Sequence, residues 1–163
     1  MLIFDLETDG LLDTVEFIHC VHIMDTEGDK GVERYNDHGY KCAGTVAEGV
    51  ARLGAADRVL AHNGIGYDYQ VLDKLYPSWK TGEKPKLEDS VVMSSVIFPD
   101  LKEKDFMARK AGGWKILGKW APVPEKMGGI IGSHSLKAWG IRLGEIKDDY
   151  DPRTETGLDL SVS

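Results

Sequence analysis

The stretch "LIFDLET" at residues 2–8 decides the fold that we predict, because it is typical of a first strand in a buried sheet and yet carries two acids. Side chains two residues apart on a strand project from the same face, so Asp5 and Glu7 share one face, opposite to their apolar neighbours. Two carboxylates so close together repel each other unless a cation neutralises them or solvent reaches this face of the strand. The pair indicates either a site for a hard cation such as Mg²⁺ or Mn²⁺, or an ordinary solvated strand face.

Further strands and helices are predicted along the chain. Strands over 17–24 and 31–36 follow the first at hairpin spacing, which favours antiparallel pairing. A helix over 45–56 with Thr45 as N-cap leads to a short apolar strand at 58–62, which pairs in parallel after this crossover. Later segments are a helix at 67–76 and either a strand or a helix at 89–98. The sequence therefore predicts an α/β fold: a mixed sheet of three antiparallel strands and then parallel crossover strands, with helices on both sides.

A last helix is predicted over residues 133–144, with Ser133 as its N-cap and its end at Gly144. Leu136, Trp139 and Leu143 fall on one face of this helix. We expect that face to be buried, which makes Trp139 a core residue and not a ligand contact.

Length and composition predict one soluble globular domain, since the chain has 163 residues of which 42% are hydrophobic. No apolar run approaches the roughly 20 residues of a membrane span, and Cys20 and Cys42 lack the spacing of a zinc site. We expect a reducing, cytoplasmic location. We place the domain at 1–147, with a Gly-rich excursion at about 99–132 that is functional or mobile. Residues 148–163 are predicted to be an acidic, flexible tail.

The charge is unevenly distributed along the chain. The net charge is −7, yet residues 101–147 contain 10 lysines and arginines against 4 acids. Tryptophans are interleaved with this basic charge in "ARKAGGWKILGKW" at 108–120. Cations beside aromatic rings are what a surface for single-stranded nucleic acid uses, with Lys115 and Lys119 as candidate phosphate contacts. The alternative is that the tryptophans are core residues and the lysines a solvated face.

Candidate binding residues also gather in "RVLAHNGIGYD" at residues 58–68, where His62, Asn63 and Asp68 lie between the end of a strand and the start of a helix. Ligands often bind at such junctions in open α/β sheets. Asp68 alone is equally well explained as an acid that stabilises the helix N-terminus. Together with the acids of the first strand, however, it predicts a divalent-metal cage that is open to an anionic ligand.

The two motifs, "DLET" and "HNGIGYD", resemble the first two motifs of the DEDD (DnaQ-like) 3′–5′ exonucleases, which have the RNase H-like fold. The resemblance is closest to the proofreading domain of family A DNA polymerases from short-tailed phages, and it extends from Met1 to about Tyr150. It implies removal of nucleotides from single-stranded DNA 3′ ends with two Mg²⁺ or Mn²⁺ ions.

The resemblance also implies roles for residues at the matching positions. Asp5 would bridge both ions, Glu7 would bind the first, and Asp68 would reach the second through water. Contacts to the 3′-terminal nucleotide would come from Thr8, Asn63 and either Leu11 or Leu12. Asp89 matches a further acid of the family, or it is simply a helix cap.

The family's last motif, Tyr-x-x-x-Asp or His-x-x-x-x-Asp, is not found in the later part of the chain, where it belongs. The residue four after Tyr150 is Thr154, and the residue five after His134 is Trp139. The second metal site is therefore expected to be weak. Three explanations remain open: a partner polypeptide, such as a DNA polymerase, supplies the motif; an acid of the tail replaces it; or the module is weakened or inactive and binds nucleic acid or a replication partner.

Overall fold

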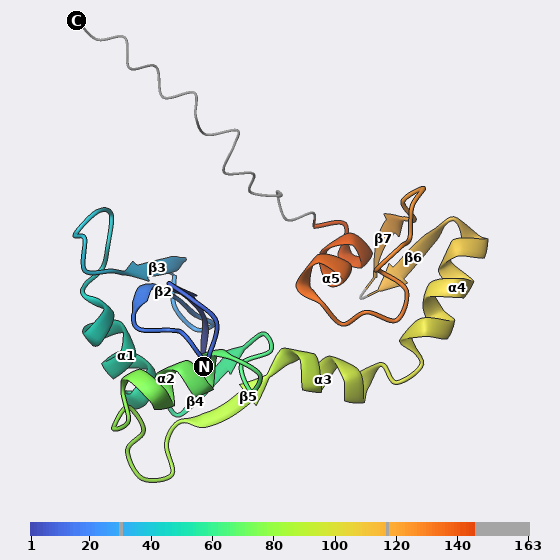
Figure 1. The fold of residues 1–163 in the computed structure, drawn as a ribbon. Helices are drawn as coiled ribbons and strands as arrows, with labels where there is room; N and C mark the ends of the chain where they lie inside the picture. The colour runs from blue at the N-terminus through green and yellow to red at the C-terminus, as the bar shows by residue number, and fades with distance from the viewer. Residues whose placement is uncertain (30, 117, 146–163) are drawn as a thin grey trace, which may run out of the picture. The chain divides into compact units, whose positions relative to one another are not determined.

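The chain forms two compact units in the computed structural model, which describes residues 1–29, 31–116 and 118–145 (Figure 1). Unit 1 comprises Met1–Pro99 and unit 2 begins at Asp100. The acidic tail predicted at 148–163 lies outside the described residues. None of the helices in the described ranges is long and apolar enough to cross a membrane.

Unit 1 is built around a five-stranded mixed sheet with the strand order β3-β2-β1-β4-β5. β1 pairs antiparallel with β2, and β2 with β3, whereas β1–β4 and β4–β5 are parallel. The mixed α/β sheet predicted from the sequence is therefore confirmed. The elements of unit 1 are β1 (Leu2–Thr8), β2 (Ile18–Asp25), β3 (Val32–Tyr35), α1 (Val46–Ala55), β4 (Arg58–Ala61), α2 (Asp68–Leu75), β5 (Lys86–Asp89) and α3 (Ser90–Ile97).

One face of this sheet carries the core. Phe4 and Leu6 are buried on that face, and Phe4 packs against Tyr69 of α2 with ring centroids 5.7 Å apart. α1 starts with the predicted cap, where Thr45 and Glu48 form a capping box. Its buried residues belong to the same hydrophobic cluster as those of α2. Both helices therefore cover the face opposite to the acids of β1.

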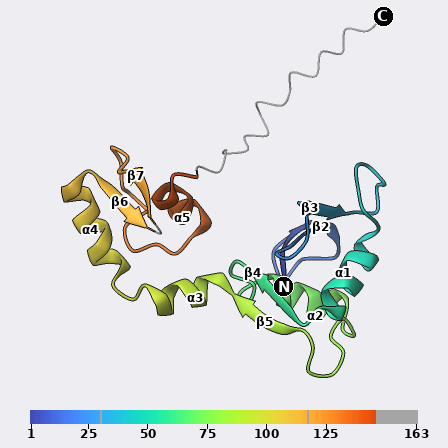
Figure 2. The ribbon, with the colours of Figure 1, turned by 180° about the vertical axis from the view of Figure 1, so that it is seen from behind.

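α3 departs from the prediction of helices on both sides of the sheet. It continues directly from β5 (Figure 2). None of its residues is buried. Four of its apolar side chains are at least 42% exposed: Val92, Met93, Val96 and Ile97. Within the described part of unit 1, no helix buries side chains against the sheet face that carries Asp5 and Glu7.

Unit 2 has a separate hydrophobic cluster of its own. Its elements are α4 (Leu101–Ala111), the antiparallel strands β6 (Gly113–Ile116) and β7 (Lys119–Pro122), and α5 (Leu136–Leu143). A helix and a hairpin thus lie within the span in which we expected an excursion. α5 is capped by Ser135, two residues later than predicted, and Leu136 is 52% exposed.

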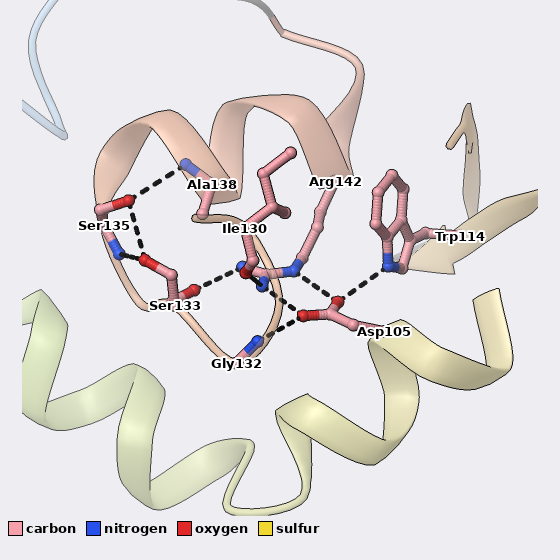
Figure 3. Close-up of polar contacts among 8 residues, drawn as sticks. All are labelled: Asp105, Trp114, Ile130, Gly132, Ser133, Ser135, Ala138 and Arg142. Atoms are coloured by element: carbon pink, nitrogen blue, oxygen red, sulfur yellow. Dashed lines mark hydrogen bonds and ion pairs between the residues drawn. The ribbon is translucent and has the colours of Figure 1, made fainter. Parts of the chain in front are cut away.

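The centre of unit 2 is a buried ion pair between Asp105 of α4 and Arg142 of α5 (Figure 3). Both side chains are fully buried, and the guanidinium donates to the carboxylate at 2.6 and 2.9 Å. Trp114 Nε1 and the Gly132 backbone N–H complete the carboxylate's shell at 2.9 and 2.8 Å. Burial raises the pKa of Asp105, but hydrogen bonds from Arg142 and Gly132 outweigh it and leave the pKa lowered. Two further guanidinium N–H groups donate to the carbonyls of Ser133 and Ile130.

Candidate functional site

The two acids of β1 lie on the solvent side of the sheet. Asp5 and Glu7 are exposed, whereas Phe4 and Leu6 are buried, so the strand alternates as its sequence predicts. Directly across on β2, Asp5 faces His22 and Glu7 faces Cys20. Such side chains have room to turn towards a ligand, since no helix of unit 1 buries residues against this face in the described ranges.

Asp68 is brought to β1 from the start of α2. Its Oδ1 accepts a hydrogen bond from the backbone N–H of Leu6 at 3.3 Å, and only 5% of the residue is exposed. Burial, together with the negative charges of Asp5 and Asp89, raises the pKa of Asp68 to about 6. Asp5 and Asp68, which are far apart in the sequence, therefore belong to one acidic group.

The loop before α2 is fixed by a different acid. Asp89 is buried, and its carboxylate accepts hydrogen bonds from the backbone N–H groups of Asn63 at 3.2 Å and Ile65 at 2.9 Å. The same carboxylate caps α3 through Val91 N at 2.8 Å. Asp89 is thus a cap, one of the two roles left open by the sequence, and it also holds the loop that carries Asn63.

His62 is partly buried, whereas its neighbour Asn63 is exposed. His62 Nδ1 lies 2.8 Å from Ser90 Oγ. Burial lowers the pKa of His62, while the charges of Asp89 and Asp5 oppose this shift, so the imidazole lies within electrostatic range of the acidic group. Asn63 is exposed and adopts a φ of 62°, a conformation that asparagine tolerates better than most residues. Its side chain is therefore available to a ligand.

Thr8 and Leu11 lie at the end of β1 and just beyond it. The Thr8 hydroxyl donates to the Gly10 carbonyl at 3.1 Å, and the Tyr67 hydroxyl contacts the same carbonyl and Thr8. These contacts join the end of β1 to the residue that precedes Asp68. Leu11 is 79% exposed, whereas Leu12 packs against the core. Of the two leucines that sequence left open, Leu11 is the one free to meet a ligand.

Lys115 and Lys119 belong to unit 2 and lie on the β6–β7 hairpin. Both are exposed, and Lys119 Nζ lies 3.1 Å from Glu145 Oε1 in a surface ion pair. Of the tryptophans in this basic segment, Trp114 is buried and Trp120 is 59% exposed. Trp114 is therefore a core residue, as the alternative interpretation expects, whereas a nucleic-acid contact at Trp120 stays a prediction.

The fit of a metal ion rests on the acids of unit 1. No group of three His, Cys, Asp or Glu side chains is arranged as a ready metal site within the described ranges. The negative charge of Asp5 nevertheless helps to raise the pKa of Asp68, so a divalent cation bound beside Asp68 would relieve this repulsion. Their oxygen ligands suit Mg²⁺ or Mn²⁺.

The spacing Tyr-x-x-x-Asp does occur at Tyr69 and Asp73 in α2, but both residues have structural contacts. The Tyr69 hydroxyl donates to the Glu88 carbonyl at 2.5 Å. Asp73 accepts from Trp79 Nε1 at 2.8 Å and pairs with Lys80. These contacts tie α2 to β5 and to the following segment, so the pair does not supply the missing motif.

Comparison with known proteins places the chain beside replication enzymes. It is 34% identical over 155 residues to the DNA-directed DNA polymerase of Escherichia phage T7, and equally to that of Enterobacteria phage T3. The chain is related to a region of phage DNA polymerase. The match covers 92% of this chain but only 20% of each polymerase, so the chain spans about a fifth of the length of these relatives. No family model matches the chain.

The raised pKa of Asp68 predicts an unusual dependence of stability on pH in this polymerase-related chain. Because the folded pKa of about 6 exceeds the usual 3.8, protonated Asp68 stabilises the metal-free fold at low pH. This contribution is lost as pH rises through 6. Asp68→Asn should remove the loss and leave the variant more stable than the wild type at pH 8 in EDTA, by up to about 3 kcal/mol.

Urea unfolding of both proteins at several pH values measures this difference. Asp29→Asn is a control, because Asp29 is an exposed carboxylate outside the helices and strands. A difference between wild type and Asp68→Asn that stays constant between pH 4 and pH 8 would show that Asp68 titrates as an ordinary carboxyl.

Proposed function

We propose that this chain is a divalent-metal-dependent 3′–5′ exonuclease module of the proofreading type, with an RNase H-like fold. It removes nucleotides from the 3′ ends of single-stranded DNA. The observation that carries the proposal is the acidic group in which Asp68 is buried against β1 beside Asp5. Its supporting context is the 34% identity to part of two phage DNA polymerases.

Asp5, Glu7 and Asp68 would hold Mg²⁺ or Mn²⁺ at the exposed face of β1. A bound metal ion would neutralise the negative charge that develops on the scissile phosphate. The protein's own part is positioning. The Leu6 N–H, next to Asp5 in β1, donates to the Asp68 carboxylate, which in this proposal would bind the same metal ion as Asp5.

The 3′-terminal nucleotide would lie between the end of β1 and the loop before α2. Thr8, Leu11 and Asn63 surround this region, and Leu11 offers an exposed apolar contact for a base. His62 is the residue that joins this loop to Ser90. The buried Asp89 keeps the loop in shape by accepting from two of its backbone N–H groups.

A second candidate is an inactive or weakened module of the same fold that binds nucleic acid or a replication partner. The sequence favours this candidate in one respect, because the motif with the fourth acid is not found where the family has it.

Digestion of end-labelled single strands separates these candidates. With Mn²⁺, we expect slow release of mononucleotides from a 3′ label and a shrinking ladder from a 5′ label. The rate should rise when a polypeptide with a Tyr-x-x-x-Asp helix is added. Absence of cleavage both with and without the added polypeptide would favour the inactive binding module. Cuts within the strand would contradict exonuclease action.

The basic hairpin of unit 2 gives a further prediction. Lys115→Glu should weaken single-strand binding and lower the salt slope of log K by about 1, since one fewer counterion is released. Lys119→Glu should have a smaller effect, because Lys119 already pairs with Glu145. Fluorescence anisotropy of a labelled oligonucleotide at several salt concentrations measures both. If the double variant Lys115→Glu with Lys119→Glu keeps the wild-type salt slope, the DNA strand binds to another surface of the protein.

A further inference from the structure

Trp120 differs from the other tryptophans in its exposure to solvent. Trp79 and Trp114 are 5% and 3% exposed and Trp139 is partly buried, whereas Trp120 is 59% exposed. An exposed apolar side chain on its own is common in soluble proteins. The way in which this indole is held on the hairpin is more informative.

The indole of Trp120 packs against Gly113. A Cβ atom on Gly113 would lie 2.3 Å from Trp120 Cζ2 and 2.6 Å from Cε2, so the ring occupies the space that any other side chain would fill. Gly113 is buried while Trp120 is largely exposed. The ring is therefore held against the strand and offers its remaining surface to solvent.

A cation accompanies the indole on the same face of the hairpin. In the β6–β7 register, Lys115 lies directly opposite Trp120, and Gly113 lies opposite Pro122. Side chains of directly opposed residues project from the same face of the sheet, so Lys115 and Trp120 are neighbours. Lys115 is exposed. The hairpin thus presents a supported aromatic ring beside an exposed positive charge.

The geometry points to Trp120 as a stacking platform for one base of a single DNA strand, with Lys115 binding an adjacent phosphate. A flat ring held in advance gives base stacking with little loss of side-chain freedom, and stacking tolerates any sequence. The surrounding segment, residues 101–147, carries 10 basic against 4 acidic residues, which favours a polyanion over a protein partner of mixed charge. DNA is chosen as the strand because of the proposed function, but the platform uses none of the acids of unit 1.

The alternative to a stacking platform is that Trp120 only stabilises the hairpin. An aromatic ring that covers a strand glycine stabilises the sheet whether or not it binds anything. In that case Trp120→Ala would lower stability and leave DNA affinity unchanged. A stacking role instead predicts a loss of affinity in Trp120→Ala that an aromatic replacement restores in part.

The test uses the full chain in EDTA, so that binding is measured without hydrolysis, and a short oligothymidylate as the probe. We expect Trp120→Ala to weaken binding by about tenfold to a hundredfold. Trp120→Phe, which keeps a ring over Gly113, should recover most of the affinity. Leu136→Ala serves as the control for loss of an exposed apolar side chain in the same unit and should bind like the wild type.

Two spectroscopic readouts make the result independent of folding defects in Trp120→Ala. The oligonucleotide should quench tryptophan emission in the wild type and lose this effect in Trp120→Phe. Ultraviolet crosslinking of an iodouracil-containing strand to the wild type should map to Trp120 by mass spectrometry. Wild-type affinity in Trp120→Ala, persistent quenching in Trp120→Phe, or crosslinks confined to other residues would each overturn the proposal. Because no metal is present, these outcomes do not depend on whether unit 1 cleaves DNA.

Discussion

Arg142→Met should destabilise unit 2 by about 3–5 kcal/mol, because it leaves the carboxylate of Asp105 buried without its cation. Both side chains are fully buried, and the guanidinium also binds two backbone carbonyls that would lose their donors. The loss should be visible as weaker hydrogen-exchange protection in residues 100–145, since α4, α5 and the loop between them meet at this pair.

A matched surface pair gives the control for this loss. Lys119 and Glu145 form an ion pair in which both side chains are more than 60% exposed. Lys119→Met should therefore change stability by less than about 1 kcal/mol. The double variant Arg142→Met with Asp105→Leu should lose less than the sum of the two single changes. Equal, small losses for Arg142→Met and Lys119→Met would show that the buried pair contributes little.

Asp5→Asn should reduce release of 3′ nucleotides by roughly 100-fold or more, since Asp5 is the acid proposed to contact both metal ions. The amide keeps the size of the side chain, and Asp5 is exposed, so the fold should be unaffected. The measurement is the initial rate on a 3′-labelled single strand in Mn²⁺, with the complementing helix added if the chain alone is too slow.

Asp29→Asn is a suitable control for the Asp5 variant, because Asp29 is an exposed carboxylate outside the strands of the sheet. It should keep the wild-type rate. Retention of more than half of the activity in Asp5→Asn would remove Asp5 from the reaction. Full activity of the chain without a complementing helix would instead direct attention to the tail acids at 148, 149, 151 and 159 as a substitute for the missing fourth ligand, to be tested by changing each to Asn.

Much of unit 1 is predictable from local patterns. The alternation in β1 places Asp5 opposite to the core, and the Thr45 cap identifies the start of α1. The hairpin spacing of the first strands correctly indicates antiparallel pairing. These signals are local, since each depends on residues within a few positions of one another.

The errors occurred where a contact between distant residues decides the outcome. The helix at 133–144 was predicted to bury Leu136, yet α5 buries Ala138 and Arg142. A sequence gives no reason to bury an arginine until its partner Asp105, 37 residues earlier, is known to face it. The ion pair with Asp105 offsets the cost of burying the charge of Arg142. Arginine, which is ordinarily exposed to solvent, is therefore buried here.

The hairpin and the acidic group illustrate the same limit. Trp114 and Trp120 look alike in sequence, and only the β6–β7 register assigns one to the core and the other to the surface. The second role of Asp89, in holding the loop around Asn63, also has no local signal, because its partners lie 24 and 26 residues away.

Calorimetric titration of the metal-free chain with Mn²⁺ tests the central claim most directly, namely that the acids of β1 and α2 form a divalent-metal site. The account predicts one well-occupied ion at neutral pH and a weaker second, because the fourth carboxylate is missing. Binding of the first ion should be lost in Asp5→Asn, weakened in Asp68→Asn and unchanged in Asp29→Asn. Absence of binding to the wild type, or equal binding to the wild type and Asp5→Asn, would contradict the account.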